Sequence, residues 1–113
     1  MGECLFCKII AGEIPSQKVF ENDKVVVIKD IKPVAPVHLL VLPKIHVANV
    51  CDPKLLEGDL LAALYGAIGQ VSFDLNLRGN GFRVVSNYGR DAGETIPHFH
   101  IHILAGRMLE GMG

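Results

Sequence analysis

The chain has 113 residues, a length that fits one domain spanning residues 1–113 and leaves little room for a second. Eleven Lys and Arg residues against twelve Asp and Glu residues give a formal net charge of -1 at pH 7, which argues against a nucleic-acid-binding surface. Half of the residues are hydrophobic and 20% are charged, so intrinsic disorder is excluded. The mean hydropathy of +0.34 predicts surplus apolar surface for a subunit interface.

The sequence predicts a cytoplasmic protein that does not enter a membrane. Its longest uncharged stretch, residues 60–73, is shorter than the about 20 apolar residues that cross a bilayer. The N-terminal residues show no basic segment followed by an apolar run, so we expect no signal peptide. Three cysteines, an odd number, together with five histidines favour a reducing compartment and a metal over disulfides.

Most of the predicted secondary structure consists of short strands. A short helix is expected over residues 5–11, ended by Gly12 and kept from resuming by Pro15. Asn22-Asp23 separates two apolar runs and predicts a hairpin turn. The five predicted strands cover residues 18–21, 25–29, 37–42, 82–86 and 98–104.

One long helix is predicted over residues 53–77, with Asp52 as an acidic N-cap and proline at its first position. Its apolar stripe consists of Leu56, Leu60, Leu64, Ile68, Val71 and Leu75. A second line holds only small residues, Gly58, Ala62, Gly66 and Gly69. This line reflects either local tolerance or the close approach of a helix from a second subunit, and we favour the second interpretation. Five strands and two helices without βαβ alternation predict an α+β fold with an antiparallel sheet.

Three of the five histidines, His98, His100 and His102, fall within five consecutive residues of the last predicted strand. Side chains alternate between the faces of a strand, so these three share one face while the apolar residues between them enter the core. Mutual repulsion between protonated rings lowers the imidazole pKa and keeps at least one ring neutral near pH 7. A neutral imidazole is what a nucleophile or a metal ligand requires.

The pattern His-φ-His-φ-His-φ-φ, where φ is an apolar residue, resembles the signature of the histidine-triad (HIT) superfamily. Further segments resemble its Hint branch, the histidine-triad nucleotide-binding proteins: FCKII (6–10), EIP (13–15), DI (30–31), PVH (36–38), LPK (42–44), GFR (81–83) and LAGR (104–107). The resemblance implies a homodimer whose two sheets join into one, and an enzyme that binds purine nucleotides. It also implies hydrolysis of the P–N bond in nucleoside 5′-phosphoramidates such as adenosine monophosphoramidate and AMP-lysine.

The resemblance also implies roles for individual residues. His100 matches the nucleophile and His38 the histidine that orients it, and the catalytic set is completed by His98, His102 and Thr95. The nucleotide-binding residues are Asp30 at the ribose, Asn87 and the backbone near Gly93 at the phosphate, and Leu5, Phe6, Ile9, Ile28 and Ile31 around the base. Attack by a neutral imidazole would form a covalent nucleotidyl-histidine, and no metal cofactor is required if hydrogen-bond donors stabilise the phosphate charge.

A zinc site is a separate expectation, with a structural role. Cys4 and Cys7 form a C-x-x-C pair, and His46 follows the third predicted strand. His98 is the fourth ligand implied by bacterial members of the superfamily. The alternative is that both cysteines are small core residues, and the missing βαβ pattern disfavours a redox motif. Cys51 is expected to be an ordinary thiol.

Two other functions stay open. Related branches with the same triad are dinucleoside-polyphosphate hydrolases and nucleotidyltransferases, but an intact triad together with Thr95 favours the phosphoramidate hydrolase. The protein could also be a non-catalytic nucleotide-binding regulatory module, against which the complete set of nucleophile, donor and ribose residues argues.

Overall fold

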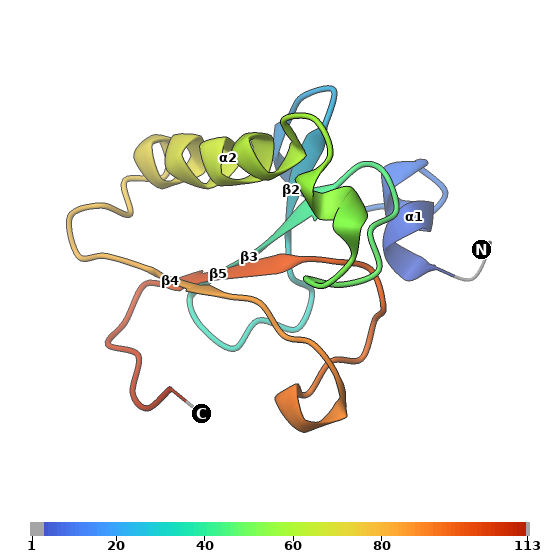
Figure 1. Cartoon of the computed structure of the whole chain (residues 1–113). Helices are drawn as coiled ribbons and strands as arrows, with labels where there is room; N and C mark the ends of the chain where they lie inside the picture. Colours follow the sequence, from blue (N-terminus) through green and yellow to red (C-terminus); the bar gives the residue numbers. More distant parts are fainter. Residues whose placement is uncertain (1–3, 113) are drawn as a thin grey trace.

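The fold is a five-stranded antiparallel sheet with one long and one short α-helix, as predicted for the α+β class (Figure 1). The computed structural model describes residues 4–112, so part of the segment searched for a signal peptide lies outside the described residues. The strands are β1 (Lys18–Glu21), β2 (Val25–Lys29), β3 (Val37–Pro43), β4 (Arg83–Val85) and β5 (Ile101–Ala105). Their order across the sheet is β1-β2-β3-β5-β4.

The predicted hairpin between β1 and β2 is confirmed. The Oδ1 atom of Asn22 accepts hydrogen bonds from the backbone N–H groups of Lys24 at 2.9 Å and Val25 at 2.8 Å. This side chain replaces backbone acceptors within the turn, which is why asparagine favours such positions. The following strand is buried on both faces from Val25 to Ile28 and pairs antiparallel with β3.

The helix predicted over residues 53–77 is wrong in its first part. A 3-10 turn, η1 (Pro53–Leu56), comes first, and the α-helix α2 (Leu60–Asp74) begins only after a break. Gly58 lies in that break with φ of +58°, a left-handed conformation that ends regular helix geometry. Leu56, before this break, is 72% exposed. At the other end, α2 stops at Asp74 and Leu75 is 43% exposed. Neither belongs to the buried stripe, and Gly58 does not belong to the line of small residues.

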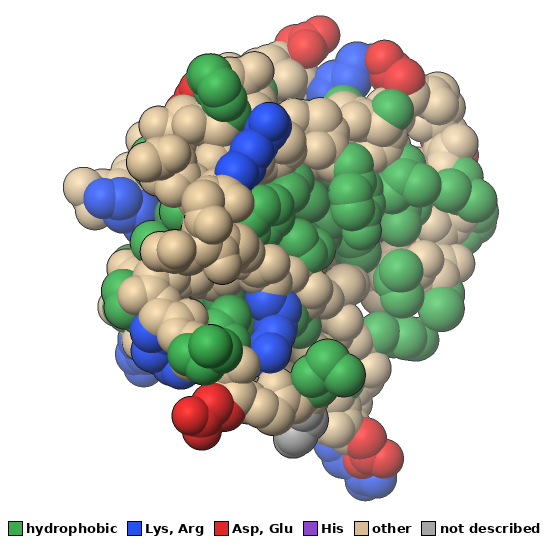
Figure 2. Space-filling view, turned by 90° about the vertical axis from the view of Figure 1, so that its left-hand side faces the viewer, with side chains coloured by type: hydrophobic (Ala, Val, Ile, Leu, Met, Phe, Trp, Pro, Cys, Tyr) green, Lys and Arg blue, Asp and Glu red, His purple; other side chains and the backbone are tan. Residues whose placement is uncertain are grey.

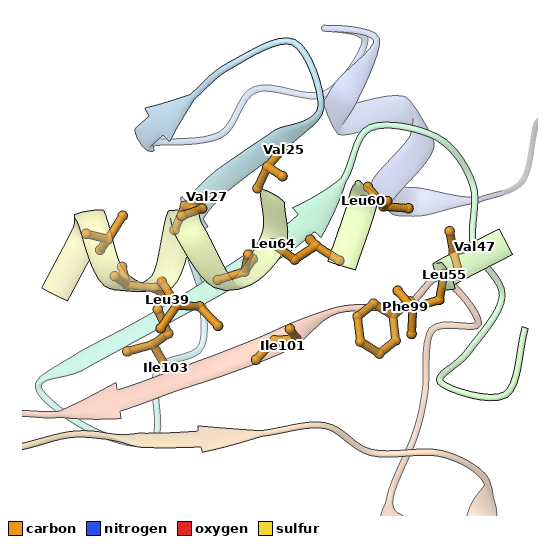
Figure 3. Close-up of a cluster of buried hydrophobic side chains, with 14 of the residues drawn as sticks. Val25, Val27, Leu39, Val47, Leu55, Leu60, Leu64, Phe99, Ile101 and Ile103 are labelled. Atoms are coloured by element: carbon orange, nitrogen blue, oxygen red, sulfur yellow. The ribbon is translucent and has the colours of Figure 1, made fainter. Parts of the chain in front are cut away.

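The remaining apolar stripe packs α2 on the sheet. Leu60, Leu64, Ile68 and Val71 are buried there against alternate residues of the strands, including Leu39, Ile101 and Ile103 (Figure 3). The members of the small-residue line that lie in α2, Ala62, Gly66 and Gly69, are not part of this core. A Cβ atom added at Gly66 or Gly69 would meet nothing within 4 Å, so no other part of the described chain fills the space beside either glycine.

The other face of the sheet carries the short helix α1 (Leu5–Ile10). Phe6 and Ile9 of α1 pack on strand residues that alternate with those facing α2, and these are Val26, Ile28, Leu40 and Leu42. Because successive strand residues point to opposite faces, α1 and α2 lie on opposite sides of the sheet. Neither helix in the described part of the chain combines the length and apolar character needed to cross a lipid bilayer.

Strand β5 begins later than the predicted residues 98–104, and β4 is shorter than the predicted 82–86. Val41 pairs with Ile101, so continuing the register would place Phe99 opposite Pro43, which has no N–H to donate. The chain leaves β3 there, and the Phe99 N–H instead donates to the carbonyl of Val47 at 2.6 Å. The segment from His98 to His100 therefore lies just before β5, beyond the end of the β3–β5 ladder.

Candidate active site

A cavity of about 420 Å³ opens on the α1 side of the sheet. One wall is apolar and comes mainly from α1, β2 and β3, and a second wall is formed by the loop after β2. The two histidines His100 and His102 line the end formed by the last strand. The full lining is Leu5, Phe6, Ile9, Ile14, Pro15, Ser16, Ile28, Lys29, Asp30, Ile31, Lys32, Leu40, Thr95, Ile96, His100 and His102.

This cavity collects nine of the residues singled out from the sequence: Leu5, Phe6, Ile9, Ile28, Asp30, Ile31, Thr95, His100 and His102. Sequence reasoning missed the residues that follow α1, from Ile14 to Ser16, although Ile14 and Pro15 lie in one of the matching segments. It also missed Lys29 and Lys32, whose positions around Asp30 offered a signal for an anionic ligand.

Two of the predicted nucleotide-binding residues, Asn87 and Gly93, do not line the cavity. The loop before β5 coils into a 3-10 turn, η2 (Arg90–Ala92), which Gly93 ends with φ of +83°. The N–H of Gly93 donates to the carbonyl of Arg90 at 3.0 Å inside this turn. That donor is therefore used by the loop itself in this structure.

His100 has one nitrogen held by the backbone and one without such a partner. Its Nδ1 lies 2.6 Å from the carbonyl oxygen of His98, and because a carbonyl can only accept, Nδ1 carries the proton. In the neutral ring this leaves the lone pair on Nε2. The ring is half-buried and lines the cavity. His100 therefore presents a lone pair of the kind that a nucleophile uses.

His38 contacts His102 rather than the nucleophile, which corrects the predicted role of His38. The buried His38 ring accepts the N–H of Val34 at Nδ1 over 3.1 Å, so its proton is on Nε2. That Nε2 lies 2.9 Å from Nδ1 of His102 and 3.3 Å from Oδ2 of Asp30. His102 consequently accepts at Nδ1 and carries its own proton on Nε2. The group that orients His100 is the backbone carbonyl of His98.

Burial keeps His102 neutral. The pKa of His102 is lowered to about 4, mainly by loss of solvent and then by repulsion from His100 and His38, while Asp30 opposes the shift. The expected neutral ring is therefore present near pH 7, but burial rather than repulsion is the main cause. A neutral His102 with its proton on Nε2 is a hydrogen-bond donor that does not repel a nearby imidazole.

His98, expected among the catalytic residues, does not line the cavity but belongs to a second cluster with Cys4, Cys7 and His46. Its Nδ1 lies 3.3 Å from the sulfur of Cys4 and 3.5 Å from the sulfur of Cys7, and His46 Nδ1 lies 3.3 Å from Cys7. His98 is fully buried, and its Nε2 proton is donated to the carbonyl of Pro43 at 3.2 Å. The Nδ1 lone pair therefore points to the cysteines.

The cluster fits a tetrahedral zinc ion. Its four ligand atoms lie within 4.8 Å of one another, and a zinc ion bound by sulfur and nitrogen would set them about 3.5 Å apart. The hydrogen bond from His98 to Pro43 is the kind of outer contact that fixes a ligand's tautomer. The N–H of Cys7 also donates to the sulfur of Cys4 at 3.3 Å. Burial and the neighbouring Cys4 raise the pKa of Cys7 to about 11, so a thiolate there requires a cation.

The comparisons with known proteins identify the family and match the fold. The family model described as "HIT domain" matches residues 11–109. A histidine triad protein from Clostridium difficile is 41% identical, with a TM-score of 0.93 and coverage of 100% of this chain and 98% of its own. A HIT family hydrolase from Clostridium thermocellum is 39% identical, with a TM-score of 0.92 and coverage of 99% and 97%. A histidine triad nucleotide-binding protein from Candida albicans is 32% identical, with a TM-score of 0.81 and coverage of 98% and 87%. The chain belongs to the HIT domain family.

Proposed function

We propose that this protein is a purine-nucleotide-binding hydrolase that cleaves the P–N bond of nucleoside 5′-phosphoramidates of the AMP-lysine or AMP-NH2 type. The observation that carries the proposal is the tautomer of His100, whose protonated Nδ1 faces the His98 carbonyl while Nε2 keeps its lone pair beside a cavity. The similarity to a HIT family hydrolase and to a histidine triad nucleotide-binding protein supports the same reaction class.

The cavity offers a separate place for each part of a nucleotide. The apolar wall, which includes Phe6 and Ile28, suits a flat purine base. Asp30 at the rim offers a carboxylate to the ribose hydroxyls, and Lys32 adds a positive charge nearby. The α-phosphate then lies at the end of the cavity formed by His100 and His102. This placement puts the reacting phosphorus next to the free Nε2 atom of His100.

The reaction proceeds in two displacements. In the first, Nε2 of His100 attacks phosphorus and forms a P–N bond to the enzyme while the bond to the leaving amine breaks. The amine nitrogen takes up a proton as it departs, and the Thr95 hydroxyl, which lines the cavity, is the group we assign to relay it. In the second, water attacks phosphorus, His100 leaves, and the water proton returns to the relay, yielding the nucleoside monophosphate.

His102 and the His98 carbonyl stabilise charge during both steps. The Nε2 proton of His102 is donated to the phosphate oxygens, whose negative charge grows in the transition state. Once His100 is bonded to phosphorus its ring is positively charged, and the hydrogen bond from Nδ1 to the His98 carbonyl stabilises that charge. His38 holds His102 in the tautomer that donates, and Asp30 supports His38 in turn.

A turnover panel tests the proposed reaction against its alternatives. Adenosine and guanosine 5′-phosphoramidates, AMP-lysine and diadenosine polyphosphates are offered to the purified protein, and nucleoside monophosphate release is measured. Phosphoramidates should be the best substrates by kcat/KM. Faster cleavage of the polyphosphates would favour the dinucleoside-polyphosphate hydrolase. AMP binding without turnover of any compound would favour the regulatory module.

We also propose that Cys4, Cys7, His46 and His98 hold a structural zinc ion. A bound zinc would cross-link α1, the segment after β3 and the segment before β5, and no catalytic step needs it. The three free cysteines of the described chain, Cys4, Cys7 and Cys51, suit a reducing, cytoplasmic setting. Metal analysis of protein purified without added zinc should find about one zinc per chain. Sub-stoichiometric metal that Cys4→Ser does not reduce would mean that the cysteines are core residues only.

A homodimer is the third part of the proposal. Hydrophobic side chains gather in a broad band on one face of the molecule, on which no histidine of the described chain is visible (Figure 2). Strand β4 is at the edge of the sheet, and exposed apolar residues include Tyr65 and Phe73 of α2 and Val84 of β4. Sedimentation should show a dimer at micromolar concentration, and Gly66→Leu, on the solvent side of α2, should weaken it. A monomer, or association that Gly66→Leu leaves unchanged, would contradict this interface.

A further inference from the structure

The turn from Cys4 to Cys7 contributes residues to both proposed sites. These are the nucleotide cavity and the metal cluster, the name used here for Cys4, Cys7, His46 and His98. Its outer residues, Cys4 and Cys7, are the two sulfur ligands of the metal cluster. Its inner residues, Leu5 and Phe6, line the nucleotide cavity. These four residues span one turn at the start of α1, where the Cys4 sulfur caps the helix by accepting the Cys7 N–H. A displacement of the sulfur atoms would therefore displace the cavity wall as well.

Phe6 also contacts histidines from both clusters. Its buried ring meets the ring of His98 edge-on, with centroids 5.8 Å apart, and meets the ring of His100 at 5.0 Å. Edge-on aromatic contacts of this kind depend on ring geometry and not only on burial. The proposed nucleophile, His100, thus packs against Phe6, which lies in the sequence between the ligand residues Cys4 and Cys7.

A second connection runs through the backbone of His98. The ring of His98 faces the cysteines, while its carbonyl oxygen accepts the Nδ1 proton of His100 at 2.6 Å. The ring has both nitrogens engaged, since Nε2 donates to Pro43. Because the ring is held at both nitrogens, it restrains the backbone of His98, and with it the position of the carbonyl. The position of His100 depends on the same residue that completes the metal cluster.

We propose that the metal cluster and the nucleotide cavity are energetically linked through the Cys4–Cys7 turn and the His98 carbonyl, so that zinc and nucleotide tighten each other's binding. The proposal rests on the nucleotide site and the zinc site proposed above. Zinc orders the cavity wall and the nucleophile before the nucleotide arrives, so the nucleotide loses less freedom on binding. Thermodynamic reciprocity requires that the nucleotide raise zinc affinity by the same factor. Cys4, Cys7 and His46 are then positioning residues and not catalytic ones.

The linkage is tested by measuring the zinc affinity of the unchanged chain, with and without saturating AMP, by competition with a chromophoric chelator. The zinc affinity of AMP itself is measured in protein-free buffer and subtracted. AMP should tighten zinc binding about tenfold, a coupling within the usual range. AMP that binds the zinc-loaded chain in calorimetry but leaves zinc affinity unchanged would overturn the linkage alone. Failure of AMP to bind at all would overturn the proposed function together with the linkage.

A matched pair of variants at His46 gives an independent readout. His46 is a metal-cluster residue that does not line the nucleotide cavity. His46→Cys keeps four ligands and is the matched variant, so in the presence of zinc its AMP affinity should exceed that of His46→Ala. His46→Ala leaves three, and its AMP dissociation constant should rise about tenfold at zinc concentrations that no longer fill the site. Weakened zinc binding with unchanged AMP affinity in folded His46→Ala would overturn the linkage. If that variant does not fold, the zinc titration of the unchanged chain decides alone.

Discussion

The histidines of the metal cluster and those of the cavity differ in whether a ring nitrogen is left without a hydrogen-bond partner. In the metal cluster, His98 uses Nε2 for the Pro43 carbonyl and turns Nδ1 to the cysteines, so neither nitrogen is available to a substrate. In the cavity, His100 uses only Nδ1, and His102 accepts from His38 at Nδ1. Both keep Nε2 without a partner among the described residues. The role of each histidine follows from which nitrogen a neighbour occupies and not from its residue type.

The largest expected effect tests the nucleophile. His100→Ala removes the free Nε2 atom and should lower phosphoramidate turnover by about 10⁴-fold, a size typical of a lost nucleophile. AMP binding should change only a few-fold, because the base and ribose contacts remain. Steady-state kinetics and calorimetry on the same preparation measure both quantities. Cys51→Ser, at an exposed position outside both clusters, is the control and should keep full turnover. Near-normal turnover of His100→Ala would place the nucleophile elsewhere.

A smaller loss is expected from the donor. His102→Ala removes the Nε2 proton that stabilises the phosphate charge and should lower kcat by about 10²-fold to 10³-fold. His102→Gln retains an N–H donor at similar reach and should recover part of that loss. Equal rates for the two variants would show that His102 contributes by packing and not by donating a hydrogen bond.

Substitutions in the metal cluster should lower the thermal stability of the protein more than its turnover. Cys4→Ser replaces a thiolate ligand and should lower the melting temperature by about 10 °C, because structural zinc contributes directly to folding free energy. Cys51→Ser changes the same atom at an exposed position and should leave the melting temperature within about 2 °C. Thermal unfolding followed by circular dichroism compares them. A melting temperature of Cys4→Ser equal to that of Cys51→Ser would remove the structural role of the cluster.

The smallest effect is a pH dependence. Burial, with smaller contributions from nearby histidines, lowers the pKa of His102 from its ordinary value of 6.5 to about 4, so between these values the unfolded chain binds a proton that the folded chain does not. The free energy of unfolding should therefore fall as pH drops from about 6.5 toward about 4. His102→Gln cannot take up that proton, and its slope should be flatter over the same window. Parallel slopes for the two proteins in denaturant titrations would contradict a neutral, buried His102.

Local patterns predicted much of the fold and failed where the backbone left regular geometry. The hairpin at Asn22 and the stripe from Leu60 to Val71 follow from turn chemistry and helical spacing. The long helix failed at Gly58, because glycine in a helical pattern can either continue it or adopt a positive φ. The late start of the last strand followed from Pro43 on a neighbouring strand, a long-range pairing that one segment's pattern does not contain.

The site was predictable in its membership and not in its internal contacts. The resemblance and the residue types indicated most of the residues that line the cavity, and all four of the metal cluster. They did not indicate that His38 contacts His102. In the sheet, His38 pairs with Leu104 and Leu40 pairs with His102, so the two histidines are diagonal neighbours on adjacent strands. Such a contact depends on register, which spacing along one chain segment does not fix.

Pro43, at the end of β3, leaves backbone carbonyls near the site free to bind side chains. In a fully zipped pair of antiparallel strands, backbone carbonyls are consumed by the partner strand's N–H groups. Here the strands separate at Pro43, and two nearby carbonyls, those of Pro43 and His98, each accept a hydrogen bond from an imidazole N–H instead. The unpaired end of the β3–β5 ladder thus supplies two fixed carbonyl acceptors. Each determines which nitrogen of a neighbouring imidazole ring, His98 or His100, carries the proton. If the strands were paired to their last residues, such carbonyls would accept backbone N–H groups of the sheet and would not be available to the histidine rings.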